Sequence, residues 1–330
     1  MSDCPAYDAL LLVSFGGPEQ REDVIPFLEN VLRGRNVPRA RLLEVAEHYY
    51  HFGGKTPIND QNRALIAALE RELAERGPRL PVYWGNRNWH PLLPDTIRRM
   101  EADGVQRALA LVTSAFSSYS GCRQYRENIE QALSSSTLRV DKLRVFYNHP
   151  GFIEAMVDNC GEALNACPEA HLIFTGHSIP LSYANTSRYA EQLQEACRLV
   201  AGQLGRADWR LVYQSRSGSP MQPWLGPDIG DYLEELGAGA TVVIAPIGFL
   251  SDHMEVVYDL DTEARQICER LGIRMARAAT AGVHPKFVSM IRELILERTE
   301  GAPRLALGNH GAGHDVCPAD CCPACASEPR

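Results

Sequence analysis

The sequence has no long hydrophobic run. A transmembrane helix needs about 20 consecutive apolar residues, and no stretch of the 330 residues approaches that length. The first residues, MSDCPAYDALLLVSFGG, also lack the basic segment and the cleavage site of a signal peptide. We therefore expect a cytoplasmic protein without a transmembrane segment.

An excess of basic residues is absent as well. The 33 lysines and arginines are outnumbered by 41 aspartates and glutamates, and the formal net charge is -8. A nucleic-acid-binding domain ordinarily carries a basic stripe or patch, so nucleic acid is not expected as a partner. Local arginine clusters could still hold a small anionic ligand.

Two common motifs of α/β enzymes are missing. Residues 14–18, SFGGP, follow a first apolar strand, but their spacing is neither that of a dinucleotide fingerprint nor that of a P-loop. Ser178 does not form a nucleophile elbow, which needs a glycine two residues away on both sides. A nucleotide-phosphate or flavin site and serine hydrolase chemistry are therefore not expected.

Short apolar runs alternate with helical patterns along the chain. Continuously apolar strands separated by helices predict parallel sheets covered by helices on both faces. We expect an α/β protein of two similar Rossmann-like halves, residues 1–147 and 148–300, each with a roughly four-stranded parallel sheet. The strands are predicted at residues 9–13, 81–84, 107–113 and 138–145, and then at 171–175, 209–214 and 241–245. The tail, residues 301–330, is rich in small residues and should be disordered unless its cysteines anchor it.

An acidic helix follows the predicted strand at residues 241–245. Pro246 and Gly248 break that strand, and a helix is predicted from residue 253 to 271. Glu255, Asp259 and Glu263 are spaced four residues apart, so they should share one helical face. Like charges so placed destabilise a helix unless a cation meets them. A solvated acidic face explains the pattern equally well.

His177 lies where another predicted strand ends, in the segment FTGHSIP. Ligands of open α/β sheets bind beyond the carboxyl ends of the strands, and the acidic helix delivers Glu255 to the same edge. A histidine that faces carboxylates could hold a divalent metal or shuttle protons, whereas a structural histidine is the alternative. His253, two residues from Glu255, should point to a different helical face.

Four of the ten cysteines crowd into the tail, at Cys317, Cys321, Cys322 and Cys325. Disulfides are disfavoured in a reducing compartment, so this clustering indicates a metal site rather than cross-links. By spacing alone, a structural zinc site, an iron–sulfur centre and an unligated tail all remain open.

The sequence resembles the ferrochelatases, which insert ferrous iron into a porphyrin in haem synthesis. The resemblance runs from about residue 7 to residue 299, and its fold implication is a pair of chelatase-type halves. It is carried by the segments LLLVSFGGP, HYYHFGGKTPI, SGCRQYRENI, IFTGHSIP, YQSRSG with PWLGPDI, and APIGFLSDHMEVVYDLD.

The resemblance implies roles for the residues at the second-half strand ends. His177 and Glu255 would face each other across the porphyrin at the site where Fe2+, the metal substrate, is inserted. Asp259 and Glu263 match an acidic line, along a helix with a π-type turn, that is proposed to carry iron or protons. Such turns occur often at functional sites.

The first half is expected, by the same resemblance, to contact the porphyrin. Thr56 and Tyr125 match porphyrin-contacting positions. Phe15 lies where some bacterial members have a tyrosine, so it is assigned no metal role. Arginines of the first-half loops, among them Arg87 and Arg123, would suit carboxylates on a flat apolar ligand, with ordinary loop charge as the alternative.

Several ferrochelatases, including actinobacterial ones, carry a [2Fe-2S] cluster on three tail cysteines and one internal cysteine. By this resemblance we expect the cluster on Cys160, Cys317, Cys321 and Cys322, with Cys325 as a substitute. Adjacent Cys321 and Cys322 can both reach one cluster only through a strained turn.

The tail and the segments GNRNWHP and SYSGCRQYREN are most similar to those of actinobacterial members, which are taken to act on coproporphyrin III. We therefore expect insertion of iron into coproporphyrin III to give Fe-coproporphyrin (coprohaem), with protoporphyrin IX as the alternative substrate. A chelatase for cobalt or a sirohydrochlorin-type ring, and a haem or iron carrier without turnover, are the other hypotheses. Transient contact with neighbouring haem-pathway enzymes is also expected.

Overall fold

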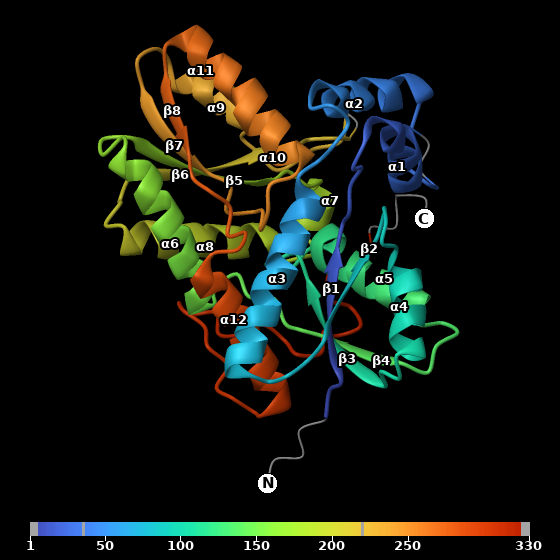
Figure 1. The fold of residues 1–330 in the computed structure, drawn as a ribbon. Coiled ribbons are helices and arrows are strands. Elements are labelled where there is room, and N and C mark those ends of the chain that lie inside the picture. The colour runs from blue at the N-terminus through green and yellow to red at the C-terminus, as the bar shows by residue number, and fades with distance from the viewer. Residues whose placement is uncertain (1–5, 35–36, 219–220, 325–330) are drawn as a thin grey trace.

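The computed structural model describes residues 6–34, 37–218 and 221–324. They fold into two α/β halves, each built on a parallel β-sheet (Figure 1). The sheets have the strand orders β2-β1-β3-β4 and β6-β5-β7-β8, and all their pairings are parallel. Both sheets thus place their first strand second in the order, so the halves share one topology and the predicted fold class is confirmed. The strands are β1 (Ala9–Ser14), β2 (Val82–Asn86), β3 (Arg107–Val112), β4 (Arg139–Lys142), β5 (His171–His177), β6 (Trp209–Gln214), β7 (Thr241–Ala245) and β8 (Arg274–Arg277).

The central strands form because their sequences are continuously apolar. Every residue of β1 is buried, and β7 is buried from its second residue onward, as expected for strands covered on both faces. Strand β8 was not predicted, because its sequence RMAR has too few apolar residues to be recognised as a strand. It lies at the sheet edge and pairs only with β7.

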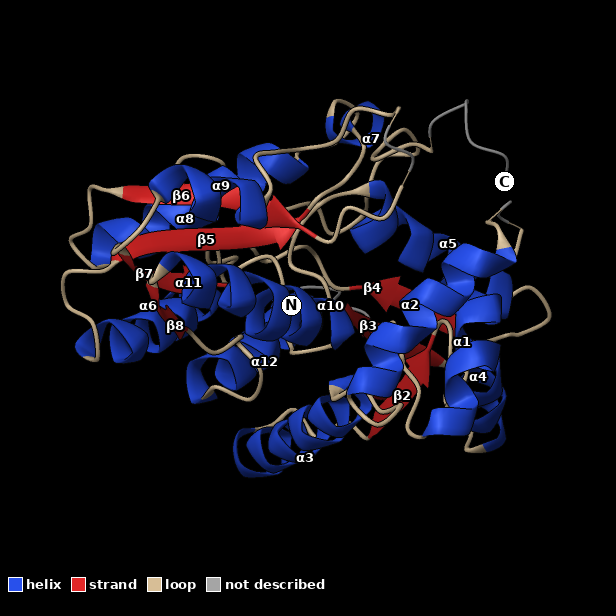
Figure 2. Cartoon of the chain, turned by 90° about the horizontal axis from the view of Figure 1, so that it is seen from above, coloured by secondary structure: helices blue, strands red, loops and turns tan. Residues whose placement is uncertain are grey.

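Helices cover both faces of each sheet, as the view from above shows (Figure 2). None of those in the described parts of the chain is long and apolar enough to cross a membrane. The first half contains α1 (Val24–Val31), α2 (Arg39–His51), α3 (Ile58–Arg76), α4 (Leu93–Ala102) and α5 (Gln124–Ala132). The second contains α6 (Pro150–Asn165), α7 (Leu181–Ala184), α8 (Tyr189–Gln203), α9 (Ile229–Leu236), α10 (Met254–Tyr258), α11 (Arg265–Leu271) and α12 (Pro285–Thr299).

The two halves share one hydrophobic core. The largest apolar cluster contains Leu10 and Leu12 of β1 together with Leu172 and Phe174 of β5. Helix α12 joins the halves further, since it packs against both α3 and α6 (Figure 1). This shared packing fixes the orientation of the two sheet edges that carry the candidate site.

Over the residues that the structure describes, each half contains one π-helix, and both follow the third strand of their sheet. The π-helix η2 (Tyr119–Arg123) lies between β3 and α5, and η3 (Asp259–Ala264) lies between α10 and α11 after β7. The continuous helix predicted over residues 253–271 is therefore interrupted at the position where the resemblance implied a π-type turn. The turn at η2 was not predicted.

Side chains of the two halves hold the tail by hydrogen bonds to its backbone carbonyls, as far as Cys321. The amide of Asn148 donates to the carbonyls of Leu307 (3.1 Å) and Gly311 (2.9 Å), and Leu307 N–H donates to the Asn148 carbonyl (2.8 Å). The Arg123 guanidinium donates to the carbonyls of Ala319 (2.6 Å) and Cys321 (3.1 Å). The tail therefore has an anchor besides its cysteines, which were the anchor considered from the sequence.

Candidate active site

His177 and Glu255 face each other at the carboxyl edge of the second sheet. His177 is the last residue of β5, and Glu255 lies in the first turn of α10, just after β7. The Nδ1–H of His177 donates to the Ser178 carbonyl at 2.5 Å, which turns Nε2 toward Glu255 Oε1 at 3.4 Å. Tyr189 holds the same strand end from behind, because its hydroxyl donates to the His177 carbonyl at 3.0 Å.

A close approach of backbone brings these two strand ends together. Gly248, in the loop after β7, donates its N–H to the Thr175 carbonyl at 3.0 Å. A Cβ at Gly248 would lie 2.6 Å from the Cα of Gly176, a distance that no side chain can occupy. Glycine is therefore required where the loop that leads to Glu255 crosses β5 next to His177.

Each member of the pair favours the charged form of the other. Burial opposes the charge on His177, but the Glu255 carboxylate and the Ser178 carbonyl outweigh it and raise the pKa of His177 to about 9. Burial likewise opposes the charge on Glu255, and the imidazolium overcomes this effect and lowers the pKa of Glu255 to about 2. The two side chains therefore form an ion pair at neutral pH.

Replacing Glu255 by glutamine should reverse the shift on His177. Without the Glu255 carboxylate, burial becomes the main influence, and the pKa of His177 should fall from about 9 to near or below its ordinary 6.5. In the wild-type protein the folded-state pKa of His177 exceeds the unfolded value, so the stability that His177 contributes is full below pH 6.5 and is lost as the pH rises toward 9. In Glu255→Gln this pH-dependent loss of stability should disappear. NMR titration of the imidazole resonances measures the pKa, and Glu263→Gln is the control that should leave it near 9.

His253 serves as the N-cap of α10. Its Nδ1 accepts a hydrogen bond from the Glu255 N–H at 3.2 Å, and burial lowers its pKa. A neutral cap orients the first turn of the helix and thereby the Glu255 side chain. The His253 Nδ1 also lies 3.8 Å from Glu255 Oε2, so the prediction that His253 points to a different helical face from Glu255 was wrong: as the N-cap, His253 precedes the helix and folds back onto its first turn.

Asp259 continues the acidic line behind Glu255. Burial first, and then the charges of Glu255 and Glu263, raise the pKa of Asp259 to about 7, although the Ser215 hydroxyl that donates to Asp259 Oδ2 opposes this rise. Burial also raises the pKa of Glu263. The line therefore runs from an ionised carboxylate to one that exchanges its proton near neutral pH.

Ser215 is a site residue that the sequence did not reveal. It follows β6 and adopts φ 63°, a left-handed conformation that non-glycine residues rarely occupy. Such backbone strain clusters at functional sites. The preceding Gln214 donates from Nε2 to the Glu255 carbonyl at 2.9 Å, so the end of β6 supports both Glu255 and Asp259.

The first half contributes an aromatic and basic surface. Tyr125 of α5 is buried, lies beneath the Arg87 guanidinium at 4.5 Å, and is close enough to Glu255 for that charge to affect its pKa. Arg87 also lies 5.7 Å from the Phe15 ring. Thr56 is buried, and its hydroxyl has no hydrogen-bond partner among the described residues. Tyr125 is therefore brought toward the pair, and Thr56 keeps an unused hydroxyl group.

Helix α2 covers the acidic line, which the sequence did not predict. The His48 ring stacks on Tyr258 of α10 at 3.8 Å between centroids, with 8° between the ring planes. Burial, and then the charge of Glu255, raise the pKa of Tyr49 in the same helix. The only sequence signal for α2 as part of the site was its HYYHFGG segment.

The tail cysteines meet an internal cysteine other than the expected one. Cys317, Cys321 and Cys322 line one pocket together with Cys122 of η2, whereas Cys160 is fully buried in α6 and does not line it. Cys160 lies instead near Cys197 in the second-half core. The sequence placed Cys160 in a helix but did not show which side of that helix it occupies. In the structure its side chain lies on the side that faces the hydrophobic core. Cys325 lies outside the described residues.

The surroundings of this pocket favour a thiolate at Cys317, whereas the hydrogen bond to Cys317 raises the pKa of Cys122 and burial raises that of Cys322. The Sγ atoms of Cys321 and Cys322 are 3.6 Å apart, and Cys322 adopts φ 51°, the strained turn that adjacent cysteines were expected to need. A hydrogen bond from Cys122, helped by Lys142, lowers the pKa of Cys317 to about 7 against the effect of burial. The remaining lining residues are the cations Arg123, Arg126 and Lys142. Within the described residues, however, no three or more His, Cys, Asp or Glu side chains are already arranged to hold a metal ion.

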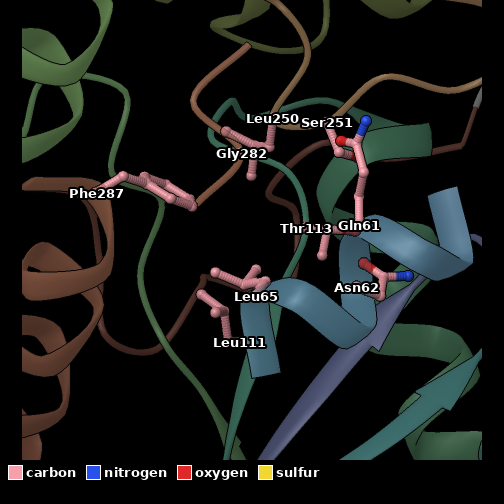
Figure 3. A pocket seen from close by; sticks show the side chains of 9 residues that line it. All are labelled: Gln61, Asn62, Leu65, Leu111, Thr113, Leu250, Ser251, Gly282 and Phe287. Atoms are coloured by element: carbon pink, nitrogen blue, oxygen red, sulfur yellow. The ribbon is translucent and has the colours of Figure 1, made fainter. Parts of the chain in front are cut away.

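A small cavity lies at the seam between the halves (Figure 3). Gln61 and Asn62 of α3 and Thr113 after β3 form its first-half wall, and Leu250 and Ser251 of the loop before α10 lie opposite. The N–H of Asp252 donates to Gln61 Oε1 at 2.8 Å, which ties this loop to the first half. The remaining lining residues are Leu65, Leu111, Gly282 and Phe287.

Comparison with known proteins identifies the family of the chain. The family model described as Ferrochelatase matches residues 7–299. The "Ferrochelatase" of Rhodopirellula baltica is 57% identical over 98% of this chain and 95% of its own length. The "Coproporphyrin III ferrochelatase" proteins of Streptomyces coelicolor and Frankia alni are 51% and 53% identical over 99% and 96% of this chain, and 96% and 87% of their own lengths.

Among solved structures, the fold is similar to that of the sirohydrochlorin chelatase SirB from Bacillus subtilis subspecies spizizenii in complex with cobalt. The TM-score is 0.55 at 12% identity, over 90% of this chain and 97% of the SirB chain. This likeness concerns the fold alone. The family match and the relatives over nearly the full length show that the chain belongs to the ferrochelatase family.

Proposed function

We propose that this protein inserts Fe2+ into coproporphyrin III to give Fe-coproporphyrin and two protons. The observation that carries the proposal is the His177–Glu255 pair, 3.4 Å apart between the end of β5 and the first turn of α10. It occurs in a chain about half identical to proteins named coproporphyrin III ferrochelatase. As a member of the ferrochelatase family the protein is a metal-inserting enzyme of the lyase class.

His177 accepts pyrrole protons in this proposal. A porphyrin loses its two N–H protons as the metal enters, so a base must lie over the ring. His177 is protonated at neutral pH because Glu255 is ionised. Fe2+ that approaches Glu255 would neutralise this carboxylate and lower the pKa of His177, so that Nε2 releases its own proton to solvent and can then accept one from a pyrrole N–H.

The acidic line connects this pair to the protein surface. Asp259, with a pKa of about 7, can both take up and release a proton near neutral pH, and Glu263 lies beyond it. Carboxylates also suit the partly hydrated Fe2+ ion. We assign Asp259 and Glu263 to the passage of iron or protons, and Thr56 and Tyr125 to contacts with the porphyrin.

Turnover with purified protein tests the choice of porphyrin. Coproporphyrin III has four carboxylates and protoporphyrin IX two, and a site that binds polar groups rejects an analogue that lacks them. We expect kcat/KM under anaerobic conditions to be about tenfold or more higher for coproporphyrin III. Equal or faster turnover of protoporphyrin IX would favour that alternative substrate instead.

Two further outcomes separate the remaining hypotheses. Faster insertion of Co2+ into a sirohydrochlorin-type ring would contradict iron insertion. Binding of haem or iron without any turnover would indicate a carrier. A carrier needs an axial ligand but no opposing acid, so the presence of both His177 and Glu255 favours the enzyme.

The tail pocket fits an iron–sulfur cluster in the type and number of its donors. Iron–sulfur clusters are held by cysteine thiolates, ordinarily four, and four thiols line this pocket beside three cations that offset negative charge. We propose that Cys122, Cys317, Cys321 and Cys322 hold a [2Fe-2S] cluster, with Cys122 in the place first expected for Cys160. The cluster would supply a fixed crosslink between the tail and η2.

A cytoplasmic location and transient contacts with neighbouring haem-pathway enzymes stay predictions.

A further inference from the structure

We propose that Arg277 is a positioning residue that fixes the helical segment that carries the acidic line of Glu255, Asp259 and Glu263. The inference rests on the proposed function, since it gives the line of Glu255, Asp259 and Glu263 a role with the metal substrate. Arg277 contacts none of these three carboxylates. It holds the two other acidic residues of the same segment, Asp252 and Asp261.

All three nitrogen groups of the Arg277 side chain are engaged. Nη1 and Nη2 donate to Oδ1 and Oδ2 of Asp252, both at 3.1 Å, and Nε donates to Oδ1 of Asp261 at 2.8 Å. The three side chains are 17%, 23% and 26% exposed, so this bridge is largely shielded from solvent. A planar guanidinium can bridge two carboxylates in this manner, and an ammonium group on a flexible stem cannot.

The bridge holds the segment on both sides of Glu255 and Asp259. Asp252 lies three residues before Glu255, and its N–H is fixed to Gln61 across the seam between the halves. Asp261 lies two residues after Asp259, inside the π-helix η3. Residues two apart in a helix do not face the same way, so Asp261 anchors η3 on the side away from Asp259.

The bridge also separates the carboxylates of this segment into those paired with Arg277 and those of the acidic line. The ion pairs of the described residues assign Arg277 to Asp252 and Asp261, whereas Asp259 and Glu263 have no lysine or arginine partner there. Arg277 supplies one positive charge to these two carboxylates, and Arg265, 3.9 Å from Asp261, supplies a second, whereas the carboxylates of the line stay available to a cation. The same strand that was not predicted, β8, delivers Arg277 to this position.

The test compares Arg277→Met and Arg277→Lys with Arg270→Met, a control in the same half that removes an exposed ion pair with Glu234. We expect KM for Fe2+ to rise about 10- to 100-fold in both Arg277 variants, as for other partners that orient metal ligands. KM for the porphyrin should stay within about twofold of wild type, and Arg270→Met should match wild type. Calorimetry with Co2+ alone, without porphyrin, should show weaker binding by the same order.

The lysine variant separates positioning from charge. A role through charge alone would be preserved in Arg277→Lys, so a lysine variant with the wild-type KM for Fe2+ would overturn the proposal. Unchanged Co2+ affinity in folded Arg277→Met would do so as well. If Arg277→Met does not fold, Asp261→Asn removes one arm of the bridge and should raise KM for Fe2+ in the same direction; no change there contradicts the inference. If wild-type protein inserts no iron, the proposed function fails, and the Co2+ titrations still decide the role of Arg277.

Discussion

Replacement of His177 by alanine should abolish iron insertion and leave the fold intact. The change removes the imidazole whose Nε2 faces Glu255 at 3.4 Å, and His253 cannot take its place without giving up the hydrogen bond by which it caps α10. General base catalysis contributes about 10²- to 10⁴-fold to a rate, and loss of the metal partner adds to this. The side chain is 30% exposed at a strand end, so its removal leaves the hydrophobic core packed.

The control for this variant is His171→Ala. His171 begins the same strand, β5, at the end away from the site, and it contacts Tyr232 Oη at 2.9 Å and Asp208 at 3.2 Å. It should keep near-wild-type turnover. Thermal unfolding and circular dichroism check that both variants are folded. Substantial insertion by folded His177→Ala would remove His177 from the mechanism and leave the proton acceptor to be sought elsewhere.

The second large effect is expected at the tail. Cys122→Ser should yield a colourless protein, whereas Cys160→Ser should keep the visible absorption of an iron–sulfur cluster. The reason is geometric, because Cys122 lines the pocket with the three tail cysteines and Cys160 lies in the core near Cys197. Cys317→Ser should lose the absorption as Cys122→Ser does.

Absorption spectra and iron and sulfide analysis of purified protein decide between the ligand sets. If the wild-type protein is colourless and contains zinc, the pocket is a structural zinc site and the cluster proposal is wrong. Loss of colour in Cys160→Ser but not in Cys122→Ser would restore the ligand set first inferred from the sequence. Cys197→Ser is a useful companion, since it alters the same core contact as Cys160→Ser without touching a proposed ligand.

The sequence predicted the layer structure well because the central strands are continuously apolar. Strands β6 and β7 have the predicted bounds, Trp209–Gln214 and Thr241–Ala245. It could also place His177 and Glu255 at one sheet edge, because carboxyl ends of parallel strands meet there. Strand β8 escaped prediction, since pairing with β7 rather than apolar composition makes its four residues a strand.

Contacts between distant segments could not be predicted. The choice between Cys122 and Cys160 depends on where the tail crosses the first half, which no local pattern encodes. Arg277 acquires its role only through the register of β8 on β7, and Ser215 through a left-handed backbone that its residue type does not suggest. The acidic residues of this segment could be identified from the sequence. Which of them pair with Arg277 and which form the acidic line could be learned only from the structure.

The course of the tail has a consequence for folding during synthesis. Arg123 is 196 residues from its partner Ala319, and Tyr7 is 291 residues from Arg298. The first half leaves the ribosome long before these partners exist. Loops of this length close slowly, so η2 and the helix that carries Tyr125 should reach their final packing only after Ala319 and Cys321 have left the ribosome.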